Sequence, residues 1–282
     1  MFSLSPCAFR LARSAVRRYS TEHPSLLANR TCLVTNCDNT RNRYLPNQIA
    51  QAYASHGARV LVEGGPNSDL NSLISSLPTP TGQKHDLLIS SEKDHGDPIG
   101  GPQSIKEKLA NITDSIDVLV NNPGTVDVPP VGFDQYPVEE FDRIVRLNLT
   151  APFALVKEII PLLEKGQAAN IILTSTEVDY PHTEEDETVK VGGAYYVSQF
   201  SFRASHMLAK LLALELHGRK ISVNTIDPGR VFLFKTPIAI PGDSDRTVPY
   251  VWLARPNTQL TGDQIDVKDW FKRDPSMFTK GY

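Results

Sequence analysis

The sequence predicts a single α/β domain built on a doubly wound parallel sheet of about seven strands. From residue 29 onward, short apolar runs alternate with longer helical patterns. The short runs are apolar throughout, as is typical of strands covered on both faces. No change of composition and no internal repeat divides the 282 residues, a length that suits one domain with a full core.

Seven apolar runs are expected to form the strands of this sheet. In chain order they are Thr31–Thr35, Arg59–Val62, Asp86–Ile89, Ile116–Val120, Asn170–Thr174, Ser222–Ile226 and Gln264–Val267. Their alternation with helices predicts a Rossmann-type sheet with helices on both faces. Ligands bind such sheets at the carboxyl ends of the strands.

Three helical patterns separate these runs. They cover Pro46–His56, Val138–Leu163 and Tyr195–Leu216. Proline suits the first turn of the first helix, and Gly57 is expected to end it. The stretch 90–102 is rich in glycine and proline and is expected to be a loop.

The composition excludes several classes of protein. A formal net charge of −3 implies no polyanionic partner, and no basic stripe suggests nucleic acid. No apolar run reaches the roughly 18–20 residues that span a bilayer. The three cysteines, Cys7, Cys32 and Cys37, form neither a disulfide framework nor a metal-binding pair, so no metal site is expected.

Residues 1–21 are expected to be a mitochondrial transit peptide that precedes a domain over residues 22–282. This stretch is rich in Ser and Ala and contains four arginines but no Asp or Glu. Arg10, Arg13 and Arg17 share one face of a helical wheel, opposite apolar residues. The pattern predicts import into the mitochondrial matrix. A disordered basic tail is the alternative.

Five motifs then follow one another in a recognisable order. They are Leu119–Gly124, Leu147–Leu149, Leu212–Leu216, Ile221–Gly229 and Leu260–Val267. The first resembles the Asn-Asn-Ala-Gly strand end of the short-chain dehydrogenases/reductases, and the fourth resembles their Pro-Gly strand end. With all five in register, the chain resembles this superfamily from about Thr31 to Val267.

The resemblance implies carbonyl or hydroxyl oxidoreduction on a small-molecule substrate. Hydride transfer to a carbonyl needs a proton donor at the oxygen, a polarising group and a fixed nicotinamide. The family supplies a Ser, a Tyr, a Lys four residues after the Tyr, and an Asn in the preceding helix. Asn148 matches the Asn, Ser175 matches the Ser with Thr176 as the alternative, and Tyr195 matches the Tyr with Tyr196 second.

No lysine occupies the place that the family gives to it. Counting from Tyr195 puts Gln199 there, whereas counting back from Leu212–Leu216 puts Phe202 there and Ser198 in the tyrosine place. The longer Tyr-to-Lys spacing of the enoyl-acyl-carrier-protein reductases also leads from Tyr195 to Phe202. A free tyrosine has a pKa of about 10, and a nearby cation lowers it by about 1–3 pH units. Without the lysine, the reactive fraction at neutral pH is expected to fall by roughly ten- to a thousandfold.

The resemblance also implies NAD or NADP, but the glycine-rich loop that would hold it is eroded. The glycines of Thr-Gly-x-x-x-Gly-x-Gly let the backbone approach the pyrophosphate. Asn36 stands at the first glycine, residues 37–48 contain none, and Gly65 replaces the charge that distinguishes the two cofactors. The remaining candidate cofactor contacts, which could equally be turn residues, are Asn121, Gly124, Pro228 and Gly229.

Three interpretations of function therefore stay open. The first is an NAD(P)-dependent oxidoreductase, and the second is a catalytically inactive subunit of a mitochondrial assembly. The third is a lyase that needs no cofactor, because Leu33–Asn36 and Ile171–Ser175 resemble the halohydrin dehalogenases, which use Ser, Tyr and Arg. No Arg stands at the spacing from Tyr195 that the halohydrin dehalogenases have. Arg203 follows Tyr196 at the longer Tyr-to-Lys spacing of the enoyl-acyl-carrier-protein reductases.

The remaining expectations concern an acidic stretch, the C-terminal tail and the oligomeric state. The stretch 176–193 is an acidic insertion, expected to be solvated surface or a lid. The tail 268–282 is expected to pack within the chain or against a second subunit. The two long helices are expected to pair in a homodimer or homotetramer, as in the family.

Overall fold

The computed structural model describes residues 25–37, 45–90, 100–122, 133–175, 194–228, 246–256 and 258–270. Its centre is one seven-stranded sheet in the order β3-β2-β1-β4-β5-β6-β7, with every neighbouring pair parallel. The strands are β1 Thr31–Val34, β2 Arg59–Gly64, β3 Asp86–Ile89, β4 Val118–Asn121, β5 Asn170–Thr174, β6 Ser222–Asp227 and β7 Gln264–Asp266. The predicted doubly wound fold is confirmed.

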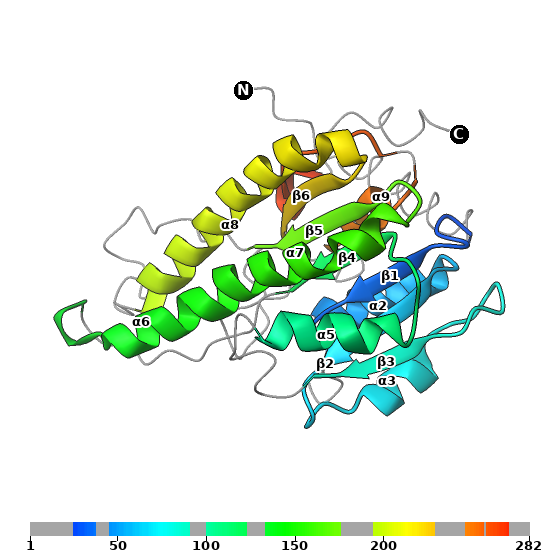
Figure 1. Cartoon of the computed structure of the whole chain (residues 1–282), viewed down its shortest axis with the longest axis horizontal. Helices are drawn as coiled ribbons and strands as arrows, with labels where there is room; N and C mark the ends of the chain where they lie inside the picture. Colours follow the sequence, from blue (N-terminus) through cyan, green and yellow to red (C-terminus); the bar gives the residue numbers. More distant parts are fainter. Residues whose placement is uncertain are drawn as a thin grey trace, which may run out of the picture.

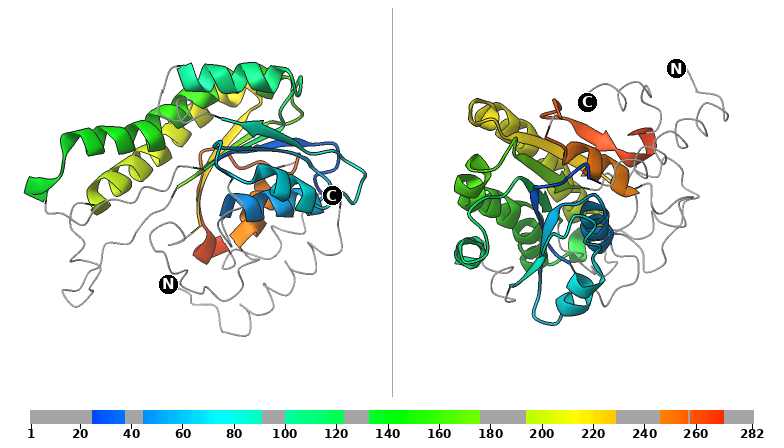
Figure 2. Two further views of the ribbon diagram at one scale, coloured as in Figure 1. Left: turned by 90° about the horizontal axis from the view of Figure 1, so that it is seen from below. Right: turned by 90° about the vertical axis from the view of Figure 1, so that its right-hand side faces the viewer.

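Helices cover both faces of the sheet, which makes three layers (Figures 1 and 2). On one face lie α5 Gly100–Ala110, α7 Ala151–Glu164 and α8 Ala194–Leu216. On the other face lie α2 Leu45–Ser55, α3 Leu70–Ser76, α9 Val248–Leu253 and α10 Val267–Trp270. The remaining elements are η1 Phe133–Gln135, α6 Val138–Val145, η2 Arg146–Thr150 and η4 His217–Arg219.

Two hydrophobic cores lie on either side of the sheet, because side chains alternate between its faces. Val34, Val60 and Val62 pack beneath α2 and α9, whereas Leu33 and Leu61 pack beneath α5 and α7. All these side chains are fully buried, which explains why the strands are apolar throughout. The rigid sheet fixes the positions of its strand ends.

Helices α3, α5, α9 and α10 and one interruption differ from the sequence-based expectation. Helix α5 begins at Gly100, inside the stretch expected to be a loop, since Pro102 suits a first helical turn and the helix buries apolar side chains. Helix α3 was not expected; the Asp69 carboxylate caps it by accepting from the Ser72 N–H. The pattern 138–163 is α6 and α7 separated by the π-turn η2.

The described start of the C-terminal tail packs within the chain. The Trp270 ring is fully buried and meets Trp252 edge to face at 5.2 Å between centroids. The Arg255 guanidinium lies over the Trp252 ring at 4.7 Å. The predicted transit peptide at residues 1–21, the acidic insertion 176–193 and residues 271–282 lie outside the described residues. Among the residues that are described, no helix is long and apolar enough to cross a membrane.

Candidate functional site

A cavity of about 210 Å³ opens at the carboxyl ends of β1, β2 and β4. We call it the strand-end cavity, and it is covered by α5 on one side and by η2 and α7 on the other. Its lining residues are Thr35, Asn36, Glu63, Pro102, Ile105, Asn121, Asn122, Leu147, Ala151, Pro152 and Leu155. Two residues predicted as cofactor contacts, Asn36 and Asn121, therefore lie in one cavity.

Asn36 forms the turn that follows β1. Its backbone φ of 58° lies in the left-handed region, which asparagine tolerates better than most residues that carry a side chain. Its N–H donates to a carboxylate oxygen of Glu63 at 3.0 Å, and the next N–H, of Cys37, donates to the Glu63 carbonyl at 2.7 Å. The turn thus keeps the left-handed backbone conformation that glycine usually adopts, although Asn36 stands in place of the glycine.

Glu63, the acidic residue near the end of β2, is fully buried in the wall of the cavity. Ser90, just after β3, donates its hydroxyl to the second carboxylate oxygen. The carboxylate therefore joins the ends of three adjacent strands. The sequence analysis missed it, although an acid inside an apolar strand was the available signal. At Gly65, where the family's charge was expected, an added Cβ would meet open space.

A hydrogen-bonded network of polar side chains forms the floor beside the cavity. Asn122 binds Thr35 twice, through its backbone N–H to Oγ1 at 3.0 Å and its side-chain amide to the carbonyl at 2.9 Å. Its amide oxygen accepts from Thr174 at 2.8 Å, and the Tyr250 hydroxyl lies 3.1 Å from the same threonine. Burial raises the pKa of Tyr250 well above its ordinary value, so this phenol stays neutral.

Asn148 lies in the π-turn η2, one residue from the cavity-lining Leu147. Its side-chain amide donates to Ser201 Oγ at 3.2 Å, and its carbonyl accepts from Ser205 Oγ at 3.2 Å. The amide oxygen is buried and has no hydrogen-bond partner among the described residues. Such π-turns occur frequently at functional sites, and this one holds the predicted asparagine against α8.

Ser175 directly follows β5, as predicted, but its side chain faces α8. The hydroxyl is fully buried and donates to the Phe202 carbonyl at 3.2 Å. It is not among the residues that line the strand-end cavity. Thr176, the alternative hydroxyl, is outside the described residues.

The contacts of α8 distinguish between the two alignments of this helix with the Tyr and Lys positions of the family. Tyr195 lies in the first turn of this continuous helix, and its side chain is outside the described part of the structure. The residue that meets Asn148 is Ser201, six residues and therefore about 9 Å further along the axis. This geometry favours the count that puts Phe202 in the lysine place, and Arg203 is exposed.

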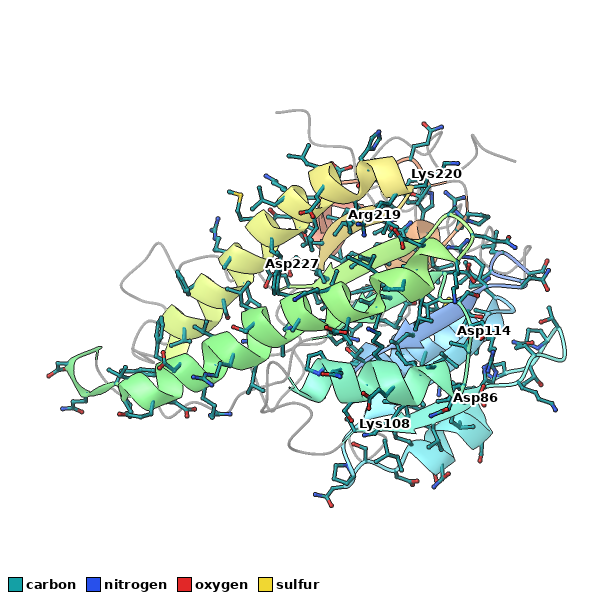
Figure 3. The ribbon with its side chains drawn as sticks, viewed as in Figure 1. Asp86, Lys108, Asp114, Arg219, Lys220 and Asp227 are labelled. Carbon is teal, nitrogen blue, oxygen red and sulfur yellow. The ribbon has the colours of Figure 1, made fainter. Side chains whose placement is uncertain are left out.

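The end of β6 contributes two buried residues to the same edge of the sheet. Asp227 is the last residue of β6 and Pro228 follows it (Figure 3). The basic residues Arg219 and Lys220 lie at the opposite end of this strand. Gly124 and Gly229, the other predicted contacts, lie outside the described residues. In the described part of the chain, no three His, Cys, Asp or Glu side chains are grouped to hold a metal ion.

Comparisons with known proteins agree with this geometry. A family model described as short chain dehydrogenase matches residues 45–241. The 3-oxoacyl-acyl-carrier-protein reductase of rhamnolipid biosynthesis from Pseudomonas aeruginosa is 29% identical over 212 residues, covering 74% of this chain and 75% of that protein. The uncharacterized oxidoreductase YciK of Escherichia coli is 27% identical over 256 residues, covering 84% and 92%.

The fold also matches solved structures. A short chain dehydrogenase from Shigella flexneri, solved in complex with NADP, superposes with a TM-score of 0.69 at 23% identity. The match covers 87% of this chain and 99% of that one. At this identity the likeness establishes the shared fold.

Proposed function

Because this chain belongs to the short-chain dehydrogenase family, we propose that it is an NAD(P)-dependent oxidoreductase acting on a small carbonyl or hydroxyl compound. The observation that carries the proposal is the strand-end cavity. It lies at the carboxyl ends of the central strands, where doubly wound folds bind dinucleotides. The reductase from P. aeruginosa and the NADP complex from S. flexneri support the same assignment.

The residues around the cavity fit the adenosine half of a dinucleotide. About 210 Å³ is below the 300–1,000 Å³ of pockets that enclose a drug-sized ligand, so it suits a part of the cofactor. Apolar side chains from α5 and α7 offer one wall for a base. Asn36, Asn121 and Glu63 offer polar groups for a ribose on the other.

The proposed catalytic hydroxyl after β5 is that of Thr176 rather than Ser175. The Ser175 hydroxyl is already engaged by the Phe202 carbonyl and points toward α8. Thr176 is the other hydroxyl that the sequence offers at this strand end. Bound nicotinamide would supply or accept the hydride, and Thr176 would polarise the substrate oxygen.

Asn148 is proposed as a positioning residue for this reaction. Its amide oxygen is buried without a partner in the described region, so it can accept a hydrogen bond from a water molecule or a neighbouring side chain. Tyr195 is proposed as the proton donor, because the longer Tyr-to-Lys spacing of the enoyl-acyl-carrier-protein reductases leads from Tyr195 to Phe202. Because neither count supplies a lysine, we expect slow turnover at neutral pH.

The test is direct titration of the purified protein with NADH and NADPH, followed by nicotinamide fluorescence. We expect submillimolar binding of at least one, and slow cofactor-dependent reduction of a panel of carbonyl compounds. Absence of binding of both at millimolar concentration would remove the oxidoreductase proposal.

We propose that the protein pairs through α7 and α8. Four apolar side chains on α8 form an exposed stripe: Phe200, Met207, Leu211 and Leu214, with exposures of 53, 59, 57 and 78%. Their spacing of seven, four and three residues puts them on one face of the helix. Phe153 on α7 is a further exposed apolar side chain, at 48%.

We also propose that the protein acts in the mitochondrial matrix. The proposal rests on the arginine-rich, acid-free sequence of residues 1–21, which has the composition of a transit peptide.

A further inference from the structure

Four buried polar residues form one continuous series of hydrogen bonds across the end of the sheet. We call this series the floor network: it begins at the hydroxyl of Tyr250 on α9 and passes through Thr174 and Asn122 to Thr35. None of the four residues is more than 5% exposed. Thr35 and Asn122 line the strand-end cavity, whereas Tyr250 packs in the core on the opposite face of the sheet, with α2 and α9 (Figure 2).

The direction of each hydrogen bond in the floor network is fixed by the chemistry of its partners. The Thr35 carbonyl can only accept, so the Asn122 amide turns its NH2 group to it and its oxygen to Thr174. That amide oxygen can also only accept, so the single hydroxyl proton of Thr174 is donated to it. The Tyr250 hydroxyl, 3.1 Å from Thr174 Oγ1, must therefore be the donor to Thr174.

Tyr250 is able to donate throughout the ordinary pH range and is itself held in place. Burial raises the pKa of its hydroxyl well above the ordinary value, so the phenol keeps its proton. A second buried tyrosine, Tyr53 on α2, donates its hydroxyl to the Tyr250 carbonyl at 3.1 Å. That bond fixes the backbone of α9 and lies outside the floor network.

At its other end, the floor network fixes the residue that follows β1. The carbonyl and the hydroxyl of Thr35 each accept a hydrogen bond from Asn122, at 2.9 and 3.0 Å. Accepting uses a lone pair of the hydroxyl oxygen and leaves its proton for another acceptor. Because Thr35 lines the cavity, a ligand bound there meets a hydroxyl whose position is set by Asn122.

We propose that Tyr250 is a positioning residue for the nucleotide cofactor and acts on the cavity wall through the floor network. Its hydroxyl holds Thr174, Thr174 holds Asn122, and Asn122 holds the Thr35 hydroxyl as a hydrogen-bond donor to the cofactor. The inference rests on the proposed function, because it concerns binding in the same cavity. It adds a residue that is not among those lining the cavity and belongs to the opposite core.

The first test compares two buried tyrosines that both hold α9. Tyr250→Phe removes the hydroxyl at the start of the floor network, whereas Tyr53→Phe removes the hydroxyl that binds the Tyr250 carbonyl. Nicotinamide fluorescence gives the dissociation constants for NADH and NADPH. We expect Tyr250→Phe to weaken binding about three- to tenfold, the size of one hydrogen bond, and Tyr53→Phe to weaken it less than about twofold. Equal weakening by both would overturn the inference, because a loosened α9 would then be the cause.

Substitutions at Thr174 separate hydrogen bonding from packing. Thr174→Val keeps the shape and loses the hydroxyl, whereas Thr174→Ser keeps the hydroxyl and loses a methyl group. We expect Thr174→Val to bind the cofactor at least as weakly as Tyr250→Phe, and Thr174→Ser to bind within about twofold of the wild type. Adding Tyr250→Phe to Thr174→Val should cause no further loss, because both changes interrupt one network. Additive losses, or weaker binding by Thr174→Ser than by Thr174→Val, would contradict the inference.

The proposed function and this inference fail in different ways. If the wild-type protein binds neither NADH nor NADPH at millimolar concentration, the proposed function falls and the inference falls with it. If the wild type binds a cofactor and Tyr250→Phe binds it equally well, the inference alone falls. Should Tyr250→Phe not fold, the comparison of Thr174→Val with Thr174→Ser decides.

Discussion

Asn36 occupies a backbone conformation that most residues avoid. A left-handed φ of 58° costs roughly 1 kcal/mol or more for an ordinary side chain, and less for asparagine. The hydrogen bond from its N–H to the Glu63 carboxylate offsets part of that cost. Asparagine can therefore replace the glycine at this position without a change in the conformation of the turn.

The two neighbouring hydroxyls after β5 should behave differently on mutation. Ser175→Ala removes the hydrogen bond from its hydroxyl to the Phe202 carbonyl, so we expect a loss of about 1 kcal/mol in the free energy of unfolding and retained turnover. Thr176→Ala should abolish or strongly slow turnover. Urea unfolding and steady-state kinetics check both. The reverse pattern would return the catalytic role to Ser175.

Adjacent glycines at the end of β2 offer a matched pair. A Cβ on Gly64 would overlap the Cys37 carbonyl oxygen, whereas a Cβ on Gly65 would meet nothing. We therefore expect Gly64→Ala to lower the free energy of unfolding by about 2 kcal/mol or more, because the first turn must move. Gly65→Ala should change it by less than about 0.5 kcal/mol. Chemical denaturation gives both values, and equal effects would contradict this packing.

At the scale of elements, the π-turn η2 decides where Asn148 points. One wider turn between α6 and α7 shifts the helical phase, so that Asn148 meets α8 while Leu147 and Ala151 line the cavity. The two serines on α8 that bind Asn148 are four residues apart, and so lie on the same face of the helix. The asparagine is thereby tied to α8 beside the cavity.

The exposed stripe of α8 predicts self-association. Wild-type protein is expected to be a dimer or tetramer at micromolar concentration, since burying these side chains removes apolar surface from water. Leu211→Glu combined with Leu214→Glu should give a monomer. Lys210→Glu, an exposed position beside the stripe, should leave the assembly intact. Sedimentation velocity distinguishes these cases, and a monomeric wild type would exclude the proposed pairing.

At the scale of the whole molecule, the described domain begins after the basic N-terminal segment. Replacing Arg10, Arg13 and Arg17 by glutamine is expected to abolish import into isolated mitochondria, because transit peptides depend on their positive face. Replacing three exposed lysines of the domain, Lys157, Lys210 and Lys220, removes the same charge and should leave import unchanged. Protease protection of the imported chain is the measurement. Import of the arginine variant would contradict the proposal that residues 1–21 are a transit peptide.

Much of the fold could be predicted because strands covered on both faces are short and mostly apolar. The run at residues 170–174, for example, coincides with β5, all of whose residues are buried. Helix α3 could not be found this way, because it is short and its signal is a single cap at Asp69. The start of α5 was hidden by glycines and a proline that are equally typical of loops.

The amino-acid sequence was enough to predict a parallel sheet of about seven strands and to mark Asn148 by a family motif. The three-dimensional structure was needed to show that Glu63 lines the cavity and that the Ser175 hydroxyl binds the Phe202 carbonyl. Asn36 and Ser90 each stand 27 residues from Glu63 along the chain. They meet it because β2 pairs with β1 on one side and β3 on the other, and the ends of paired parallel strands lie together.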